Sequence, residues 1–199
     1  MVKALVVVAH PDDETIWCGG TILTHPNWKW VILSLCRADD KDRAPKFRKA
    51  CRKLKAKCAM SDLEDEHPEK KLKSIEEVKR RVRAMLEEAR AGSWFDYVFT
   101  HGSNGEYNHN RHKEVHRAVK EMIEERELAC KKIFFFNYRL NERSTHCEPA
   151  TRNAELNMRL SEEITRKKTL LISSIYEFSI ESFEQRSAQR VESFQVVDL

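Results

Sequence analysis

Four ionisable side chains follow directly on an apolar stretch near the start of the chain. The segment AHPDDE, residues 9–14, supplies the side chains of His10, Asp12, Asp13 and Glu14. Carboxylates at such short range raise one another's pKa, so the cluster needs a cation or a catalytic task to hold it together. A single aspartate could cap the helix that begins here, but capping does not explain the whole cluster. The segment therefore predicts a divalent metal site.

A second cluster of histidines can complete such a site. Histidine and aspartate suit zinc or another first-row divalent ion, and a catalytic site needs a third protein ligand and one position open for water. The segment HGSNGEYNHNRHKEVHRAV, residues 101–119, contains His101, His109, His112 and His116. The last three are three and four residues apart and share one face of a helix. This spacing leaves open whether His109 pairs with His112, or His112 with His116.

Both clusters follow apolar segments of strand length. Such segments occur at residues 4–9, 30–36, 97–100 and 133–136, and charged segments with helical apolar spacing lie between them. Alternating strands and helices predict an α/β fold with a mainly parallel sheet and helices on both faces. Ligands bind beyond the carboxyl ends of the strands in such sheets, which is where both clusters would lie. The length of 199 residues fits a single domain, residues 1–199.

The helical spacing is clearest from Ile75 to Ala89 and from Val115 to Ile123. Residues 137–153 carry little periodicity, so we expect an irregular loop there, followed by a helix over roughly residues 155–168. Residues 175–199 show no pattern that favours one structure.

Charge and cysteine content bear on which ligands the protein binds and in which compartment it resides. The chain has 36 basic and 32 acidic residues, a net charge of +4 that is small beside the gross charge and gives little support for nucleic-acid binding. Much of the basic excess lies in residues 41–57, either as a solvated helix face or as a surface for an anionic or phosphate-bearing ligand. Six cysteines without CxxC spacing, and a first strand in place of a signal peptide, favour the cytoplasm. No apolar stretch approaches the ~20 residues of a membrane span.

The two motifs together resemble the PIG-L/LmbE-like family of zinc-dependent de-N-acetylases, which act on N-acetylglucosamine units. The family signature is AHPDDE after the first strand and a later HxxH, here within GEYNHNRHKEVH. Asn108 replaces a common glycine there, and Asn110-Arg111 replaces Pro-Asp. Weaker similarities are a helix led by Arg43, the segment SDLED at 61–65 and VESF at 191–194. The resemblance implies a Rossmann-like three-layer sandwich.

The resemblance also implies roles for the two motifs. His10, Asp13 and His112 would bind the metal, Asp12 would be the general base, and His109, as an imidazolium, would act on the oxyanion or the leaving group. This assignment selects His109 and His112 as the functional pair. Zinc is the implied metal, and ferrous iron would fit the same three ligands.

Three further side chains have implied or expected roles. Arg43 would face the acyl or carboxylate end of the ligand, and Tyr107, beside the second motif, is the aromatic residue best placed to contact substrate. Glu14 has two open interpretations: a partner that fixes the tautomer of a ligand histidine, or a charge that stabilises a helix N-terminus.

We therefore expect a metal-dependent hydrolase that removes the acetyl group from a small molecule or glycoconjugate containing N-acetylglucosamine. One alternative is a metal-dependent phosphoesterase, to which residues 41–57 would bring an anionic substrate. Another is a catalytically inactive metal- or nucleotide-binding relative, against which the retained Asp12 and His109 argue. The sequence does not choose the aglycone, and it leaves a homo-oligomer open.

Overall fold

The computed structural model describes residues 1–199 and contains a seven-stranded sheet. Its strands are β1 (Lys3–Val8), β2 (Lys29–Ser34), β3 (Lys57–Met60), β4 (Trp94–Thr100), β5 (Ala129–Phe136), β8 (Leu156–Arg159) and β9 (Val191–Asp198). Their order is β3-β2-β1-β4-β5-β9-β8. The first five strands run parallel, whereas β9 is antiparallel to both β5 and β8. The expected mainly parallel sheet is confirmed.

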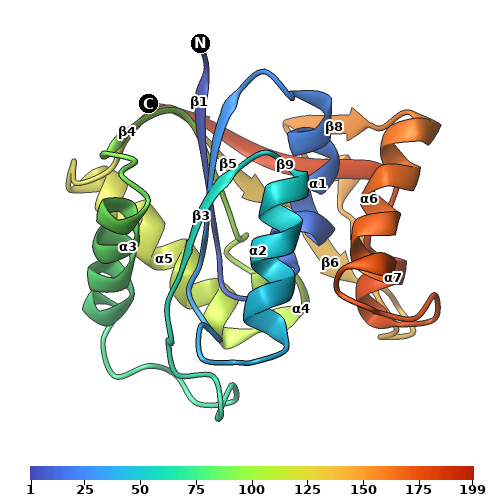
Figure 1. Cartoon of the computed structure of the whole chain (residues 1–199), viewed down its shortest axis with the longest axis horizontal. Coiled ribbons are helices and arrows are strands. Elements are labelled where there is room, and N and C mark those ends of the chain that lie inside the picture. Colours follow the sequence, from blue (N-terminus) through green and yellow to red (C-terminus); the bar gives the residue numbers. More distant parts are fainter.

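Helices cover both faces of this sheet (Figure 1). They are α1 (Asp13–Thr24), α2 (Arg43–Lys53), α3 (Glu76–Glu88), α4 (Gly105–Asn108), α5 (Asn110–Glu124), α6 (Glu162–Ser174) and α7 (Phe183–Ser187). Successive residues of a strand point to opposite faces, so Val6 and Val8 pack with α1 and α2, while Leu5 and Val7 pack with α3 and α5. The three-layer α/β sandwich is thus confirmed.

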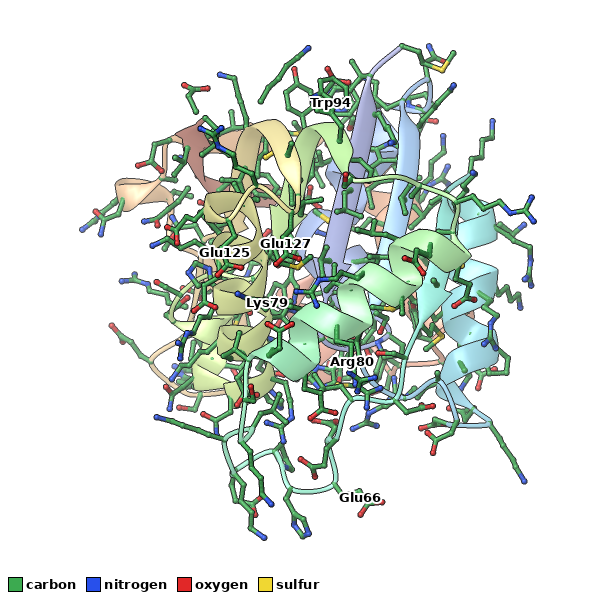
Figure 2. The ribbon with its side chains drawn as sticks, turned by 90° about the vertical axis from the view of Figure 1, so that its left-hand side faces the viewer. Glu66, Lys79, Arg80, Trp94, Glu125 and Glu127 are labelled. Carbon is green, nitrogen blue, oxygen red and sulfur yellow. The ribbon has the colours of Figure 1, made fainter.

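The α3–α5 layer is also held by ion pairs at its surface (Figure 2). The Lys79 ammonium lies 2.8 Å from a Glu125 carboxylate oxygen, and Arg83 Nε lies 2.6 Å from Glu127. Beneath these pairs, the apolar face of each helix is buried against the sheet, as the helical spacing predicted.

The second half of the chain departs from several expectations. Residues 137–153 contain a hairpin of β6 (Tyr138–Leu140) and β7 (Cys147–Pro149) instead of an irregular loop. The helix expected over 155–168 is wrong in its first part, where residues 156–159 form β8. The helix begins only after Ser161, whose hydroxyl accepts a hydrogen bond from the Ile164 N–H and caps α6. No helix is both long enough and apolar enough to cross a bilayer.

The last strand, β9, is hydrogen-bonded through one side chain to both α1 and α6. The buried Glu192 carboxylate of β9 accepts hydrogen bonds of 2.7 Å from the N–H groups of Gly20 and Thr21 in α1. The same carboxylate accepts from the buried Lys168 ammonium of α6 at 2.7 Å. Glu192 therefore anchors α1, the helix that carries the first motif, to the C-terminal part of the chain.

Candidate metal centre

Two neighbouring strands bring the sequence motifs together. β1 and β4 are hydrogen-bonded in parallel, with Val7 opposite Thr100, so the residues that follow each strand emerge at the same edge of the sheet. His10 lies in the turn after β1, and Asp13 is the first residue of α1. His112 lies in the first turn of α5, after the loop that follows β4.

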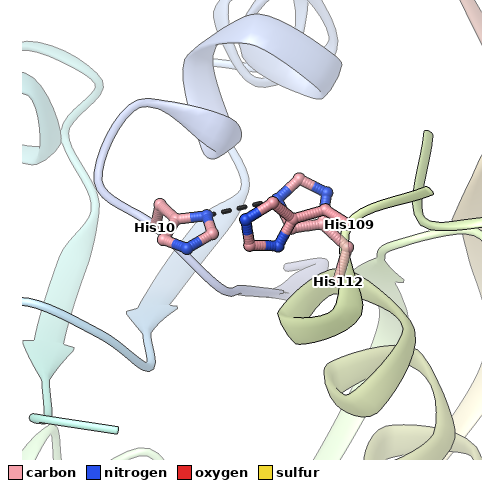
Figure 3. Close-up of side chains that lie close together, drawn as sticks. All are labelled: His10, His109 and His112. Carbon is pink, nitrogen blue, oxygen red and sulfur yellow. Dashed lines mark hydrogen bonds between the residues drawn. The ribbon is translucent and has the colours of Figure 1, made fainter. Parts of the chain in front are cut away.

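Three potential ligand atoms form a nearly equilateral triangle. His10 Nδ1 is 3.2 Å from His112 Nε2, and Asp13 Oδ2 is 3.3 Å from the first atom and 3.4 Å from the second. Figure 3 shows the imidazoles of His10 and His112 facing each other across this gap. Tetrahedral coordination with bonds of about 2.1 Å separates ligand atoms by about 3.4 Å. The donor set and its spacing therefore fit a divalent ion with three protein ligands.

A buried carboxylate fixes the orientation of His112. Glu106 Oε2 lies 2.6 Å from His112 Nδ1 and 2.9 Å from His101 Nδ1, and Glu106 Oε1 accepts a hydrogen bond from the Gly102 N–H at 2.7 Å. Burial alone would raise the pKa of Glu106, but the two histidines lower it to about 2. An ionised Glu106 places a proton on Nδ1 of His112 and leaves the lone pair of Nε2 for a metal.

His101 lies next to the triangle but has a different role. Its Nε2 accepts a hydrogen bond of 2.9 Å from the Ala9 N–H, so the lone pair of that atom is already used. The His101 ring stacks on His112 with centroids 3.9 Å apart. We therefore interpret His101 as a residue that packs against the His112 ring. His116 bonds through Nδ1 to the His101 carbonyl at 2.9 Å, outside the triangle.

A second carboxylate lies behind His10. His10 Nε2 is 3.2 Å from Asp65 Oδ1, and Arg37 Nη2 is 3.0 Å from the other oxygen of Asp65. Burial would raise the pKa of Asp65, but His10 and Arg37 lower it to about 2. Each histidine of the triangle thus has a carboxylate at its outer nitrogen, an arrangement that orients metal ligands. Asp65 belongs to the segment SDLED, the signal through which sequence analysis could have found it.

Asp12 lies in a strained turn beside the triangle. Its backbone φ is 104°, a value that side-chain-bearing residues rarely adopt. Its Oδ2 is 3.1 Å from Arg43 Nη1, and its carboxylate lines an open pocket. Burial and the neighbouring Asp13 raise the pKa of Asp12 well above its usual value, an effect that Arg43 partly offsets. A carboxylate of raised pKa is a stronger proton acceptor.

His109 faces the same pocket with an unsatisfied ring atom. Its Nδ1 is buried without a hydrogen-bond partner, and its ring lies edge-on to His10 with centroids 4.8 Å apart (Figure 3). Burial, His112 and His10 lower the pKa of His109 to about 3. So low a pKa favours a neutral imidazole, whereas the sequence led us to expect an imidazolium. His109 nitrogen also lies within 4.8 Å of the ligand nitrogens of His10 and His112, which makes it a competing ligand candidate.

The pocket above the triangle has mostly polar walls. Besides the residues already described, its lining includes Arg43, Tyr107, Phe183 and Glu184. The Tyr107 ring packs against Phe183, with centroids 5.0 Å apart. Arg43 lies over the ring of Phe178 at 4.5 Å and pairs with Asp12. Arg43 and Tyr107 are therefore both placed at the pocket.

Glu14 contacts no ligand histidine. Its carboxylate accepts hydrogen bonds from the Asp12 N–H at 3.0 Å, from the Thr15 hydroxyl at 2.5 Å and from the Tyr176 hydroxyl at 2.7 Å. Of its two interpretations, only the one at the helix N-terminus fits these contacts. No periodicity in the sequence indicated the partner Tyr176.

Both sequence motifs lie within a segment that matches a known protein family. The family model described as PIG-L, GlcNAc-PI de-N-acetylase, matches residues 5–123. A sequence relative, the uncharacterized protein L374 of Acanthamoeba polyphaga mimivirus, is 24% identical over 129 residues, which cover 58% of this chain and 55% of the relative. The chain thus spans about half the length of that relative.

Solved structures share the fold at low sequence identity. The conserved protein TT1542 of Thermus thermophilus has a TM-score of 0.73 at 16% identity, with 98% of this chain and 94% of that chain covered. The 4-carboxy-2-hydroxymuconate hydratase GalB of Pseudomonas putida has a TM-score of 0.69 at 15% identity, with 100% of this chain and 97% of that chain covered. The N,N'-diacetylchitobiose deacetylase of Pyrococcus horikoshii has a TM-score of 0.65 at 15% identity, with 98% of this chain and 84% of that chain covered. A deacetylase and a hydratase thus share this fold.

Proposed function

Because the chain belongs to the PIG-L family of GlcNAc-PI de-N-acetylases, we propose that it is a metal-dependent amidohydrolase that removes the acetyl group from an N-acetylglucosamine-containing substrate. The observation that carries the proposal is the triangle of His10, Asp13 and His112 ligand atoms beside Asp12 in an open pocket. Three protein ligands and an adjacent carboxylate base are the parts that metal-assisted amide hydrolysis needs. We propose zinc as the ion, with ferrous iron as the alternative for the same ligands.

Each polar group of the pocket has a task in this reaction. A divalent ion held by His10, Asp13 and His112 would lower the pKa of a water and polarise the acetyl carbonyl. The Asp12 carboxylate would accept a proton from the attacking water and pass it to the departing amine nitrogen. The neutral His109 ring donates an N–H hydrogen bond to the acetyl oxygen as negative charge develops there. Arg43 keeps the Asp12 carboxylate directed at the pocket through their 3.1 Å contact.

The substrate class follows from the family and from the pocket lining. We propose a small molecule or glycoconjugate whose N-acetyl sugar enters between Tyr107 and Arg43, both of which line the pocket. All six cysteines are free thiols, which is in keeping with a reducing cytoplasm as the proposed location.

The test is acetate release from a panel of N-acetylglucosamine conjugates by purified, zinc-supplemented protein, with free amine measured in the same samples. Asp12→Asn should retain zinc and the fold but lose at least about 100-fold in turnover, because general-base catalysis contributes that much or more. Asp39→Asn, which alters an exposed carboxylate of the same type, serves as the matched control.

Three outcomes would overturn the proposal. No acetate from any conjugate would exclude the activity, and an Asp12→Asn variant as fast as wild type would exclude the assigned base. Phosphate release from phosphorylated sugars, without acetate release, would favour the phosphoesterase alternative instead.

A further inference from the structure

A buried hydroxyl group from outside the family match reaches the first motif. Tyr176 follows α6, lies beyond the matched residues 5–123, and is only 2% exposed. Its hydroxyl donates a hydrogen bond of 2.7 Å to Glu14 Oε1. The contact joins residues 162 positions apart in the chain. The C-terminal part of the protein therefore touches the turn that carries Asp12.

The contact continues through Glu14 to the backbone of Asp12. Glu14 is fully buried, and its second oxygen, Oε2, accepts the Asp12 N–H at 3.0 Å. Asp12 has a φ of 104°, a conformation that persists only where surrounding contacts impose it. The Asp12 N–H bond to Glu14 is such a contact, because it fixes the peptide that precedes the strained Cα atom.

Glu14 is itself held by a small set of donors. Oε1 receives the hydroxyls of Tyr176 and Thr15, and Oε2 receives the Asp12 N–H. Thr15 is adjacent in the sequence and moves with the same helical turn, whereas Tyr176 comes from a different element. Tyr176 is thus the one donor that can fix the Glu14 carboxylate relative to the rest of the protein.

From these contacts we infer that Tyr176 is a positioning residue that acts through Glu14 to keep Asp12 in its strained conformation, with the Asp12 carboxylate in the pocket. The inference rests on the proposed function for the role of Asp12 as base. Without the Tyr176 hydroxyl, Oε1 of Glu14 loses its only donor from outside α1. The turn can then relax and rotate the Asp12 carboxylate away from the substrate.

A second buried tyrosine provides a matched control. Tyr138 is 1% exposed, and its hydroxyl also donates to α1, to the backbone carbonyl of Trp17 at 3.0 Å. Tyr138→Phe and Tyr176→Phe each remove one buried hydrogen bond to the same helix, a loss of roughly 1–3 kcal/mol in either case. Of these two hydrogen bonds, only that of Tyr176 is connected to Asp12, through the Glu14 carboxylate.

The experiment compares the two variants as zinc-supplemented protein by hydrogen exchange of the Asp12 amide and by steady-state kinetics. In Tyr176→Phe, we expect the Asp12 amide to exchange about tenfold faster than in wild type and kcat to fall about tenfold, the loss expected from one hydrogen bond. KM and zinc affinity should stay within about twofold of wild type. Tyr138→Phe should leave both the Asp12 exchange rate and kcat unchanged.

The double variant Asp12→Asn/Tyr176→Phe separates positioning from a general loss of structure. It should turn over no more slowly than Asp12→Asn alone, because Tyr176 has no effect once the base is gone. The inference is overturned if Asp12 exchanges equally fast in Tyr176→Phe and Tyr138→Phe. If wild type releases no acetate, the proposed function fails, and the exchange rates still decide whether Tyr176 positions Asp12.

Discussion

Substitution of Glu106 by glutamine tests how the metal ligands are oriented. The glutamate accepts hydrogen bonds from three donors, the ring N–H groups of His112 and His101 and the Gly102 N–H. A glutamine has only one acceptor oxygen, so at least one of these donors must face an amide NH2 group. Because Glu106 is 2% exposed, no water can relieve that conflict.

The size of the expected loss in zinc affinity follows from the contact of Glu106 with His112. Carboxylates that hydrogen-bond to ligand histidines contribute about 10–100-fold to metal affinity, or ~1.4–2.7 kcal/mol. The short 2.6 Å contact to His112 Nδ1 places Glu106 in this class. We therefore expect Glu106→Gln to weaken zinc binding by at least about tenfold.

The assay is competition for zinc between the protein and a chromogenic chelator at neutral pH. Glu114→Gln is the matched control, since Glu114 is a nearly buried carboxylate of α5 that accepts from Arg111 at 2.7 Å and from the Leu72 N–H at 2.6 Å. Both variants lose a buried charge, but only Glu106 contacts a ligand histidine. A zinc affinity of Glu106→Gln within threefold of wild type would refute the reasoning.

Two further variants test other parts of the structure. His109→Ala should retain zinc with an affinity within about threefold of wild type but lose about 100-fold in kcat, measured by the same competition and by acetate release; loss of zinc would instead make His109 a ligand. Lys168→Met should destabilise the protein by about 3 kcal/mol in urea unfolding, because it leaves the Glu192 carboxylate, which is 0% exposed, without its cation. Wild-type stability of that variant would show that the backbone and hydroxyl donors of α1 suffice for Glu192.

The central strands and the two motifs that carry the candidate ligands were predictable because their signals are local. Unbroken apolar runs mark β1, β2, β4 and β5, which are buried on both faces. The edge strand β3 is only four residues long and half exposed, so KCAM carries no comparable run. β8 is the other edge strand, and it is likewise short and largely exposed, so the sequence there indicates a helix instead of a strand.

The residues behind the ligands were less predictable because their positions depend on distant segments. Glu106 reaches His112 only because its backbone adopts a φ of 53° inside the loop after β4. Asp65 reaches His10 from the segment that follows β3, a strand that the sequence did not indicate. Tyr176 meets Glu14 only once α6 has packed on α1. The resemblance to a family points to His10, Asp13 and His112 as candidate ligands, but not to the groups that hold them.

The most direct test of the account is the position of the metal in a crystal of the zinc-loaded protein, located by anomalous diffraction at the zinc edge. We predict one strong peak bonded to His10 Nδ1, Asp13 Oδ2 and His112 Nε2, with the fourth position open to the pocket beside Asp12. A peak bound by His109, or by Cys36 and Asp65 with His10, would contradict the central claim. So would a fourth protein ligand in the open position, because no site for the attacking water would remain.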